Sequence, residues 1–296
     1  MVLVPLHQQL QDKLAALRQR RAFNVEQWVD QKISMFVDFL SRNNLSGAVL
    51  SLSGGIDSSA VLALCSKAMS IPHSPLKRLI AIAQPIHSTV KIQNRAYEVA
   101  DFLGVECITV DQTQIHDQLV DLVDTAVGIN SSFFAKGQLR SYQRTPVNYF
   151  IAQLLSQEGF PAVVVGTGNF DEDGYLRYFC KAGDGVVDVQ LIADLHKSEV
   201  YEVARFLNLP DSIVNSVPSA DLWESQTDEE ELGMPYDFIE LLTEWMKLED
   251  EERKEFICDL GDEAERQFFS MKNKADDIHR RNAHKVGFPV NLNILE

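Results

Sequence analysis

A turn rich in serine and glycine, residues 53–59 (SGGIDSS), stands where an apolar run ends and a helical pattern begins. Gly54 and Gly55 let the backbone turn tightly and approach a ligand, and the first N–H groups of the next helix are unpaired and carry the positive end of its dipole. The serine hydroxyls add donors, so the turn suits a pyrophosphate group. Asp57 alone would repel phosphate, and its expected role is to hold a Mg²⁺ ion that bridges the phosphates. The alternative is an ordinary strand-to-helix turn in which Asp57 only caps the helix.

This turn differs from the two commonest phosphate-binding loops. It contains no lysine, and neither G-x-x-x-x-G-K-[ST] nor G-x-G-x-x-G occurs in it. It resembles the pyrophosphate loop of the N-type ATP pyrophosphatases, a family that cleaves ATP between the α and β phosphates to adenylate a substrate. The resemblance implies that AMP and pyrophosphate are the products. The residues that it implies for ATP binding are Ser51, Leu52, Ser53, Gly54, Gly55, Ile56, Asp57 and Ser58.

Further blocks narrow the family. The similarity to NAD synthetases covers roughly residues 25–290, and its blocks are 136–138, 166–172, 178–188, 194–197, 218–222, 226–233 and 284–285. That family amidates nicotinic acid adenine dinucleotide (deamido-NAD) to NAD: ATP adenylates the pyridine carboxylate, and ammonia then displaces AMP. The resemblance implies the same activity here, in a homodimer, with ammonia either free or delivered by a separate glutaminase.

The resemblance also assigns roles to single residues. Glu172 matches a second magnesium carboxylate beside Asp57, and two carboxylates plus phosphate oxygens are a normal Mg²⁺ ligand set. Lys197 matches a lysine that binds the ATP phosphates, and Asp188 could take the proton from ammonium. These four residues are expected to be catalytic. The further ATP-binding positions are Thr167, Lys197 and Ser219, and the deamido-NAD positions are Tyr142, Arg144, Lys181, Asp188, His284 and Lys285.

The sequence departs from the family pattern at several positions. Eight residues separate Glu172 from Lys181 where seven are expected, so the extra residue is expected to bulge this loop and to shift Glu172. Tyr142 stands where the family has an arginine, and a lost arginine removes a cationic donor worth about 1.5 to 3 kcal/mol. Two other functions therefore stay open: a pyrophosphatase-family ligase that adenylates a different carboxylate, and a non-catalytic nucleotide-binding relative. Two structural alternatives are a solvated surface position for Lys197 and a solvated tail at residues 284–285.

Short apolar runs alternate with helical patterns along the chain. The runs 47–52, 79–83, 107–110 and 162–165 predict strands, residues 58–69 and 92–103 predict helices, and Asn24 with Gln27 predicts the start of another helix. This alternation predicts an α/β fold, a Rossmann-like doubly wound parallel sheet with helices on both faces. We expect one domain over residues 1–296, with an N-terminal helical extension (1–45), a mobile active-site loop (211–235) and a C-terminal helical segment (236–296).

Composition limits the classes of function. The 296-residue chain carries a formal net charge of −16, a field that should repel nucleic acid. Most of the acidic excess lies in residues 221–265, which hold 18 Asp and Glu against 3 Lys and Arg. No run of 18 apolar residues predicts a membrane span, and four cysteines without C-x-x-C spacing favour a reducing compartment. We expect a cytoplasmic protein that binds neither nucleic acid nor membranes.

Overall fold

The computed structural model of the chain describes residues 4–216 and 228–287. The elements up to the last strand are α1 (Gln8–Arg21), α2 (Val25–Arg42), β1 (Gly47–Ser51), α3 (Ile56–Ser70), β2 (Arg78–Ala83), α4 (Val90–Leu103), β3 (Glu106–Thr109), α5 (Thr113–Val127), α6 (Phe133–Gln157), β4 (Ala162–Gly166), the π-helix η1 (Phe170–Leu176) and β5 (Val189–Gln190). Those that follow are α7 (Lys197–Phe206), α8 (Asp211–Val214), α9 (Asp228–Leu232), α10 (Tyr236–Met246), α11 (Asp250–Cys258), α12 (Asp262–Arg281) and the 3-10 turn η2 (Ala283–Lys285).

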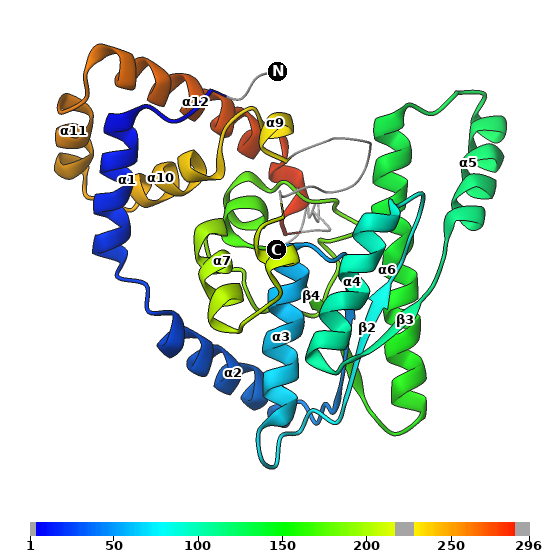
Figure 1. Cartoon of the computed structure of the whole chain (residues 1–296). Coiled ribbons are helices and arrows are strands. Elements are labelled where there is room, and N and C mark those ends of the chain that lie inside the picture. Colours follow the sequence, from blue (N-terminus) through cyan, green and yellow to red (C-terminus); the bar gives the residue numbers. More distant parts are fainter. Residues whose placement is uncertain (1–3, 217–227, 288–296) are drawn as a thin grey trace, which may run out of the picture.

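A five-stranded sheet positions the candidate site. The strand order is β3-β2-β1-β4-β5, and every pairing is parallel, which confirms the predicted fold class (Figure 1). β1 lies between β2 and β4, so that Leu50 is aligned with Ala81 on one side and Val165 on the other. The carboxyl ends of parallel strands meet at one edge of a sheet, and ligands bind in the crevice there. The glycine turn after β1 and Thr167 after β4 therefore open on the same edge.

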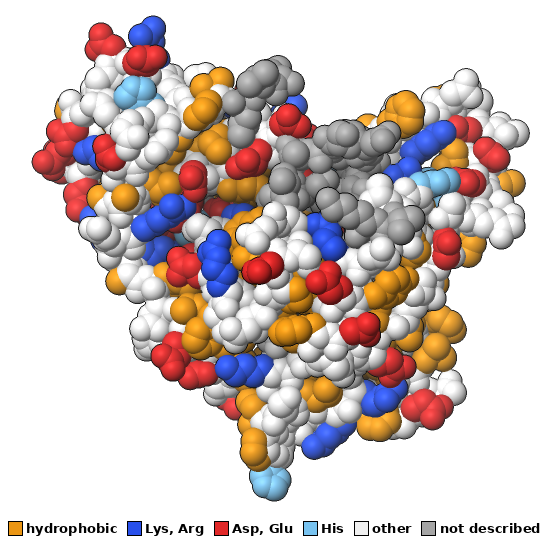
Figure 2. All heavy atoms as spheres, viewed as in Figure 1, with side chains coloured by type: hydrophobic (Ala, Val, Ile, Leu, Met, Phe, Trp, Pro, Cys, Tyr) orange, Lys and Arg blue, Asp and Glu red, His pale blue; other side chains and the backbone are white. Residues whose placement is uncertain are grey.

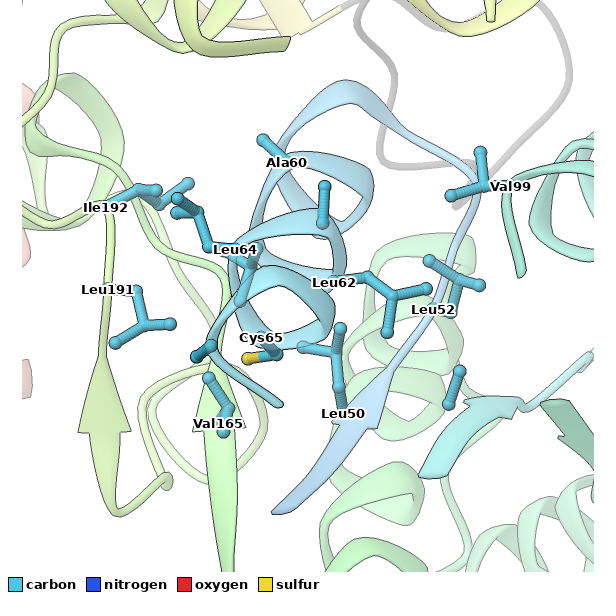
Figure 3. Close-up of a cluster of buried hydrophobic side chains, with 14 of the residues drawn as sticks. Leu50, Leu52, Ala60, Leu62, Leu64, Cys65, Val99, Val165, Leu191 and Ile192 are labelled. Atoms are coloured by element: carbon cyan, nitrogen blue, oxygen red, sulfur yellow. The ribbon is translucent and has the colours of Figure 1, made fainter. Parts of the chain in front are cut away.

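Helices cover both faces of the sheet. On one face, Leu50 of β1 packs into a buried cluster with residues of α3 such as Leu62 and Leu64 (Figure 3). On the other face, Val49 packs with Ile151 of α6. Successive strand residues point to opposite faces, so a strand that is covered on both sides needs an unbroken apolar run. This is why Ala48, Val49 and Leu50 of β1 form an unbroken apolar run.

A second core lies away from the sheet, where α1 packs beside α10 and α12 (Figure 1). Leu10 and Leu14 of α1 are buried in it together with Phe238 of α10 and Phe268 of α12. The rings of Phe238 and Phe268 meet edge to face, with their centroids 5.8 Å apart. The predicted N-terminal helical extension thus contains a helix whose apolar face is part of this second core.

The basic residues of α1 face the acidic helices that follow α9. The ion pairs between them are Lys13 with Asp259, Arg18 with Asp237 and Glu240, Arg20 with Glu252, and Arg21 with Glu244. Part of the acidic excess of residues 221–265 is therefore neutralised by the N-terminal helix. On the face of the molecule that Figure 2 shows, acidic and basic side chains are interspersed.

Two predictions about local structure can be compared with the observed elements. The side chain of Asn24 accepts a hydrogen bond from the Gln27 amide at 2.9 Å and begins α2, as predicted. The range expected to form a mobile loop, 211–235, has the short helices α8 and α9 near its ends, and residues 217–227 lie outside the described residues. Within the described part of the chain, no helix combines the length and the apolar character needed to span a bilayer.

Candidate active site

The glycine turn has the backbone geometry that its sequence predicts. Gly54 has φ 76°, a left-handed conformation that favours glycine, and Gly55 is the N-terminal cap of α3. The Ser53 hydroxyl accepts a hydrogen bond from the Gly55 amide at 3.2 Å and lies 3.0 Å from the Ser58 hydroxyl. The N–H groups of the first turn of a helix have no partner within the helix. The turn therefore presents backbone donors at the sheet edge.

The other hydroxyls near the turn have internal partners. Ser59 is fully buried and donates to the Gly55 carbonyl at 2.7 Å, so it supports the turn and does not face a ligand. The Ser51 hydroxyl donates to Asn148 of α6 at 2.9 Å. Leu52 and Ile56 are buried apolar side chains, each 3% exposed. These two residues can contact a nucleotide only through their backbone.

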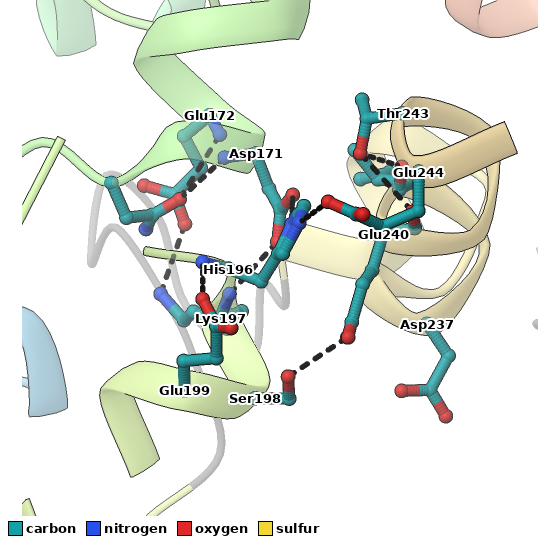
Figure 4. Close-up of polar contacts among 12 residues, drawn as sticks. Asp171, Glu172, His196, Lys197, Ser198, Glu199, Asp237, Glu240, Thr243 and Glu244 are labelled. Carbon is teal, nitrogen blue, oxygen red and sulfur yellow. Dashed lines mark hydrogen bonds and ion pairs between the residues drawn. The ribbon is translucent and has the colours of Figure 1, made fainter. Parts of the chain in front are cut away.

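Three charged side chains from distant segments meet beside this turn. The Lys197 ammonium, at the first position of α7, donates to Asp57 Oδ2 at 2.6 Å. It also donates to Glu172 Oε1 at 2.9 Å (Figure 4). Lys197 is only 4% exposed, so the alternative of a solvated surface lysine is wrong, and the two carboxylates are 19% and 20% exposed. The structure thus brings together three of the residues that were predicted to be catalytic.

Burial and the ammonium act in opposite directions on the two carboxyl groups. Burial raises the pKa of Asp57, although the charge of Lys197 offsets part of this effect. Burial also opposes ionisation of Glu172, but the Lys197 charge and hydrogen bonds outweigh it, and the pKa of Glu172 is lowered. For Lys197, burial opposes the charge and the two carboxylates outweigh it, so its pKa is raised. The lysine is therefore a cation at neutral pH.

The donor set at this point fits a magnesium ion. Asp57 and Glu172 direct one oxygen each toward a single cation, the Lys197 ammonium, and hard carboxylate oxygens are the ligands that Mg²⁺ prefers. No cluster of three or more His, Cys, Asp or Glu with metal-binding geometry occurs among residues 4–216 and 228–287. The chain would thus supply two carboxylates, and phosphate oxygens and water would complete the coordination.

Two further residues hold the carboxylates in place and were not predicted as site residues. Tyr236, at the start of α10, donates its hydroxyl to Glu172 Oε1 at 2.5 Å, and its ring lies 5.0 Å from the Lys197 ammonium. Asn169 donates to Asp57 Oδ1 at 3.1 Å and accepts from the backbone amides of Asp171 and Glu172. Asn169 could have been found as a helix cap before two acids. No local sequence signal marks Tyr236.

The extra residue between Glu172 and Lys181 has a structural counterpart. Residues Phe170–Leu176 form a π-helix, in which each hydrogen bond spans one residue more than in an α-helix. The widened turn is consistent with the expected bulge. Glu172 nevertheless still meets Lys197, so the extra residue does not separate this carboxylate from the cluster.

The residues predicted to bind deamido-NAD fall into two groups. Lys181, His284 and Lys285 lie together: the Lys181 ammonium donates to the His284 carbonyl at 2.9 Å, and Lys285 donates to the carbonyls of Arg177 and Phe179. The side chain of His284 is exposed. The 3-10 turn η2 therefore packs on the loop that follows the π-helix.

The other predicted residues lie on α6 and directly before β5. Tyr142 is 37% exposed and Arg144 is half-buried, both on α6. Asp188 accepts a hydrogen bond from the Val164 amide at 2.7 Å and from the Tyr149 hydroxyl, and neither partner belongs to the cluster of Asp57, Glu172 and Lys197. Its role as a proton acceptor stays a prediction. Thr167 is half-buried after β4, and Ser219 lies outside the described residues.

A buried histidine precedes Lys197. His196 is fully buried, with Nδ1 2.7 Å from Asp171 Oδ1 and Nε2 2.8 Å from Glu244 Oε1 (Figure 4). Both ring nitrogens can donate to carboxylates only when the imidazole is protonated. Burial by itself lowers the pKa of His196, but the hydrogen bonds to Asp171 and Glu244 outweigh it and raise the pKa to about 9.

This histidine predicts a loss of stability at alkaline pH. Because the pKa of His196 is about 9 in the folded chain and 6.5 ordinarily, its contribution is complete below pH 6.5 and is lost as the pH rises through 9. We expect the free energy of unfolding to fall by about 3 kcal/mol over this range. Chemical denaturation at pH 6.5 and 9.5 measures it. His196→Gln should remove most of the difference and the exposed-site control His73→Asn should keep it; equal losses in all three proteins would contradict this prediction.

Comparisons with known proteins show the family of the chain. A model of the NAD synthase family matches residues 28–289. The NH(3)-dependent NAD(+) synthetase of Methanococcoides burtonii is 32% identical over 263 residues, which are 87% of this chain and 95% of that protein. The protein of the same name from Pyrococcus horikoshii is 30% identical, over 88% of this chain and 93% of that protein.

Solved structures share the fold. An NMN synthetase from Francisella tularensis superimposes with a TM-score of 0.76 at 24% identity, over 92% of this chain and 99% of that chain. The NH3-dependent NAD synthetase from Campylobacter jejuni superimposes with a TM-score of 0.68 at 21% identity, over 92% and 100%. At these identities the likeness concerns the fold alone. The family model matches most of this chain, and the alignments cover almost the full length of the two relatives. The chain therefore belongs to the NAD synthase family.

Proposed function

We propose that this protein catalyses the reaction of its family, the ATP-dependent amidation of deamido-NAD by ammonia to give NAD, AMP and pyrophosphate. The observation that carries the proposal is the meeting of Asp57, Glu172 and Lys197 beside a glycine turn that opens on the carboxyl edge of the sheet. Binding the phosphates of a nucleoside triphosphate needs backbone donors, a cationic side chain and metal-binding carboxylates at one place. This edge of the sheet holds all three.

The first step needs no protein nucleophile. The substrate carboxylate attacks the α-phosphorus of ATP, the bond to the β-phosphate oxygen breaks, and pyrophosphate leaves with the electron pair. The backbone amides after Gly54 and Gly55 would bind the leaving pyrophosphate at the positive end of α3. The chain's contribution is therefore to position the phosphates and to stabilise charge that develops on them.

Asp57 and Glu172 would hold Mg²⁺, which, when bound, neutralises charge on the phosphate oxygens. In the structure the Lys197 ammonium neutralises the same two carboxylates. When ATP and the metal bind, we expect the ammonium to turn toward a phosphate oxygen, since its attraction to the carboxylates is then shared with the metal. Tyr236 keeps Glu172 oriented throughout.

The second step places ammonia on the adenylated carboxylate. The ammonia nitrogen attacks the carbonyl carbon, the bond to AMP breaks, and one proton is lost from nitrogen to give the amide. Cationic groups near the acceptor suit its pyrophosphate, and Lys181, on the loop after the π-helix, lies beside His284 and Lys285 of η2. We propose that these residues, with Tyr142 and Arg144, contact deamido-NAD.

One assay tests the proposal. Purified protein with Mg-ATP, ammonium chloride and deamido-NAD should form AMP and NAD in equal amounts. AMP without NAD would reject deamido-NAD as the acceptor and support a ligase for another carboxylate, and parallel reactions with nicotinic acid mononucleotide would examine one such acid. No AMP with any acid would overturn the enzymatic function and favour a nucleotide-binding protein. Omitting magnesium should stop AMP formation.

We also propose that the chain forms a homodimer through an apolar surface of α5 and the start of α6. Ile115 and Leu122 lie two helical turns apart on α5 and are 59% and 68% exposed, and Phe133 is 86% exposed. The two helices pack against each other, exposed large apolar side chains on them suit an interaction site, and a second copy offers the same residues in return. The four cysteines are unpaired, which fits a reducing compartment, and we place the dimer in the cytoplasm.

The dimer predicts a mass of twice the chain in sedimentation measurements. Leu122→Asp combined with Phe133→Asp should give a monomer that is still folded, because both side chains are solvent-exposed in the single chain. Met35→Asp, at an exposed site on α2, is the matched control and should leave the dimer intact. A wild-type monomer at micromolar concentration would refute the homodimer.

A further inference from the structure

Arg21, the last residue of α1, reaches across to the start of α7. Its guanidinium pairs with Glu199, donates to the Asp194 carbonyl at 3.0 Å, and lies 3.1 Å from Glu244 Oε1. The side chain is only 23% exposed. One guanidinium therefore connects the N-terminal helix to residues on both sides of Lys197 and to α10.

Two of the acceptors of Arg21, Glu199 and Glu244, take part in fixing the position of Lys197. Glu199 also accepts the His196 amide at 2.9 Å and so closes the capping box that begins α7 (Figure 4). Glu244 contacts the His196 ring, and the other ring nitrogen contacts Asp171. Asp171 in turn accepts the Lys197 amide at 2.8 Å. The backbone of Lys197 is thus held from two directions, and both lead back to Arg21.

We propose that Arg21 is a positioning residue for Lys197, and that α1 thereby sets the geometry of the phosphate-binding cation. This inference rests on the proposed function for the role of Lys197 itself. α1 lies outside residues 28–289, the range that the family model matches, so this support for the site comes from a segment beyond that match.

Positioning matters because the Lys197 ammonium must lie within hydrogen-bond distance of two carboxylates at once. It lies 2.6 Å and 2.9 Å from two carboxylate oxygens, and a small shift of the first turn of α7 would lengthen both contacts. A misplacement of about 1 Å at a reacting group can cost roughly 100-fold in rate. Arg21 donates in a fixed planar fork, which holds several acceptors in one arrangement.

The experiment compares substitutions in α1 by steady-state kinetics. Arg21→Gln should lower kcat for NAD formation by roughly 10- to 100-fold while the KM for deamido-NAD changes little. Arg21→Lys should recover only part of kcat, because an ammonium cannot reproduce the fork. Two controls separate positioning from general docking of the helix. Arg20→Gln removes an exposed ion pair with Glu252, and Leu14→Ala weakens the packing of α1 without touching the contacts of Arg21.

All variants are assayed at a temperature at which circular dichroism shows them folded. Leu14→Ala should lower Tm and leave kcat within about twofold of wild type, whereas Arg21→Gln should lower kcat. If Leu14→Ala lowers kcat as much as Arg21→Gln, or if Arg21→Gln leaves kcat unchanged, the positioning role is wrong.

Binding of a non-hydrolysable ATP analogue with magnesium gives a readout that does not depend on turnover. Arg21→Gln should weaken this binding, and Arg20→Gln should not. If the wild-type protein binds the analogue but forms no NAD, the proposed function fails while this arm still tests Arg21. Equal affinity of the wild-type and Arg21→Gln proteins for the analogue would overturn the positioning role in either case.

Discussion

Replacing Asp57 with asparagine should abolish AMP formation while the protein stays folded. The amide keeps the shape of the side chain but removes the charge that would hold Mg²⁺ against the phosphates. Metal stabilisation of phosphate charge is worth several kcal/mol, so we expect a loss of at least about 1,000-fold in the rate of AMP formation. Lys197 keeps its second contact, with Glu172, and the free energy of unfolding should change by about 1 to 2 kcal/mol.

Release of AMP from ATP in the presence of each acceptor is the measurement, with chemical denaturation on the same samples. Asp101→Asn, at an exposed acid near the end of α4, is the matched control and should behave as wild type. Wild-type turnover by the Asp57→Asn protein would refute the magnesium role. Loss of activity together with loss of the folded state would require the comparison at lower temperature, where the folded variant must still be inactive.

Replacing Lys197 with methionine should impair both stability and catalysis. The two carboxylates of Asp57 and Glu172 would face each other without the cation between them, and removing one partner of a buried ion pair costs about 3 to 5 kcal/mol. Loss of the donor that faces the phosphates should lower kcat by roughly 100- to 1,000-fold, the range seen when one charge-stabilising donor is removed.

Magnesium separates the two effects. Because Lys197→Met leaves two carboxylates without their ammonium, added Mg²⁺ should raise the Tm of this variant more than that of the wild-type protein. Lys77→Met, at an exposed lysine before β2, controls for the loss of a charge and should leave Tm and kcat unchanged. An equal magnesium effect on all three proteins would show that these carboxylates do not bind the ion.

The sheet could be predicted from the sequence because its strands are buried on both faces. The predicted runs 47–52 and 162–165 differ by only one residue at an end from β1 (Gly47–Ser51) and β4 (Ala162–Gly166). β5 was not predicted. It has two residues, Val189 and Gln190, and is held by pairing with β4, so no periodic pattern marks it.

The candidate site could be predicted where residues follow a strand or a motif. Asp57 is in the glycine turn, and Glu172 and Lys197 belong to blocks that resemble those of NAD synthetases, so their convergence was expected from that resemblance. Ser59 was expected to face the ligand and does not, since its hydroxyl bonds the Gly55 carbonyl inside the helix. A hydroxyl in the first turn of a helix can serve either purpose, and only the rotamer in the folded chain distinguishes them.

The sequence by itself determined the parallel α/β sheet and the phosphate-binding turn, because these depend on local periodicity and on glycine's backbone freedom. The charged residues around the turn were identified through the resemblance to NAD synthetases. Only the tertiary structure decided how those charges are held. Arg21 and Glu199 are separated by 178 residues, and Tyr236 reaches Glu172 across 64. Such contacts arise when the helices of the second core pack against α7 and the π-helix, and no local pattern encodes which side chains then meet.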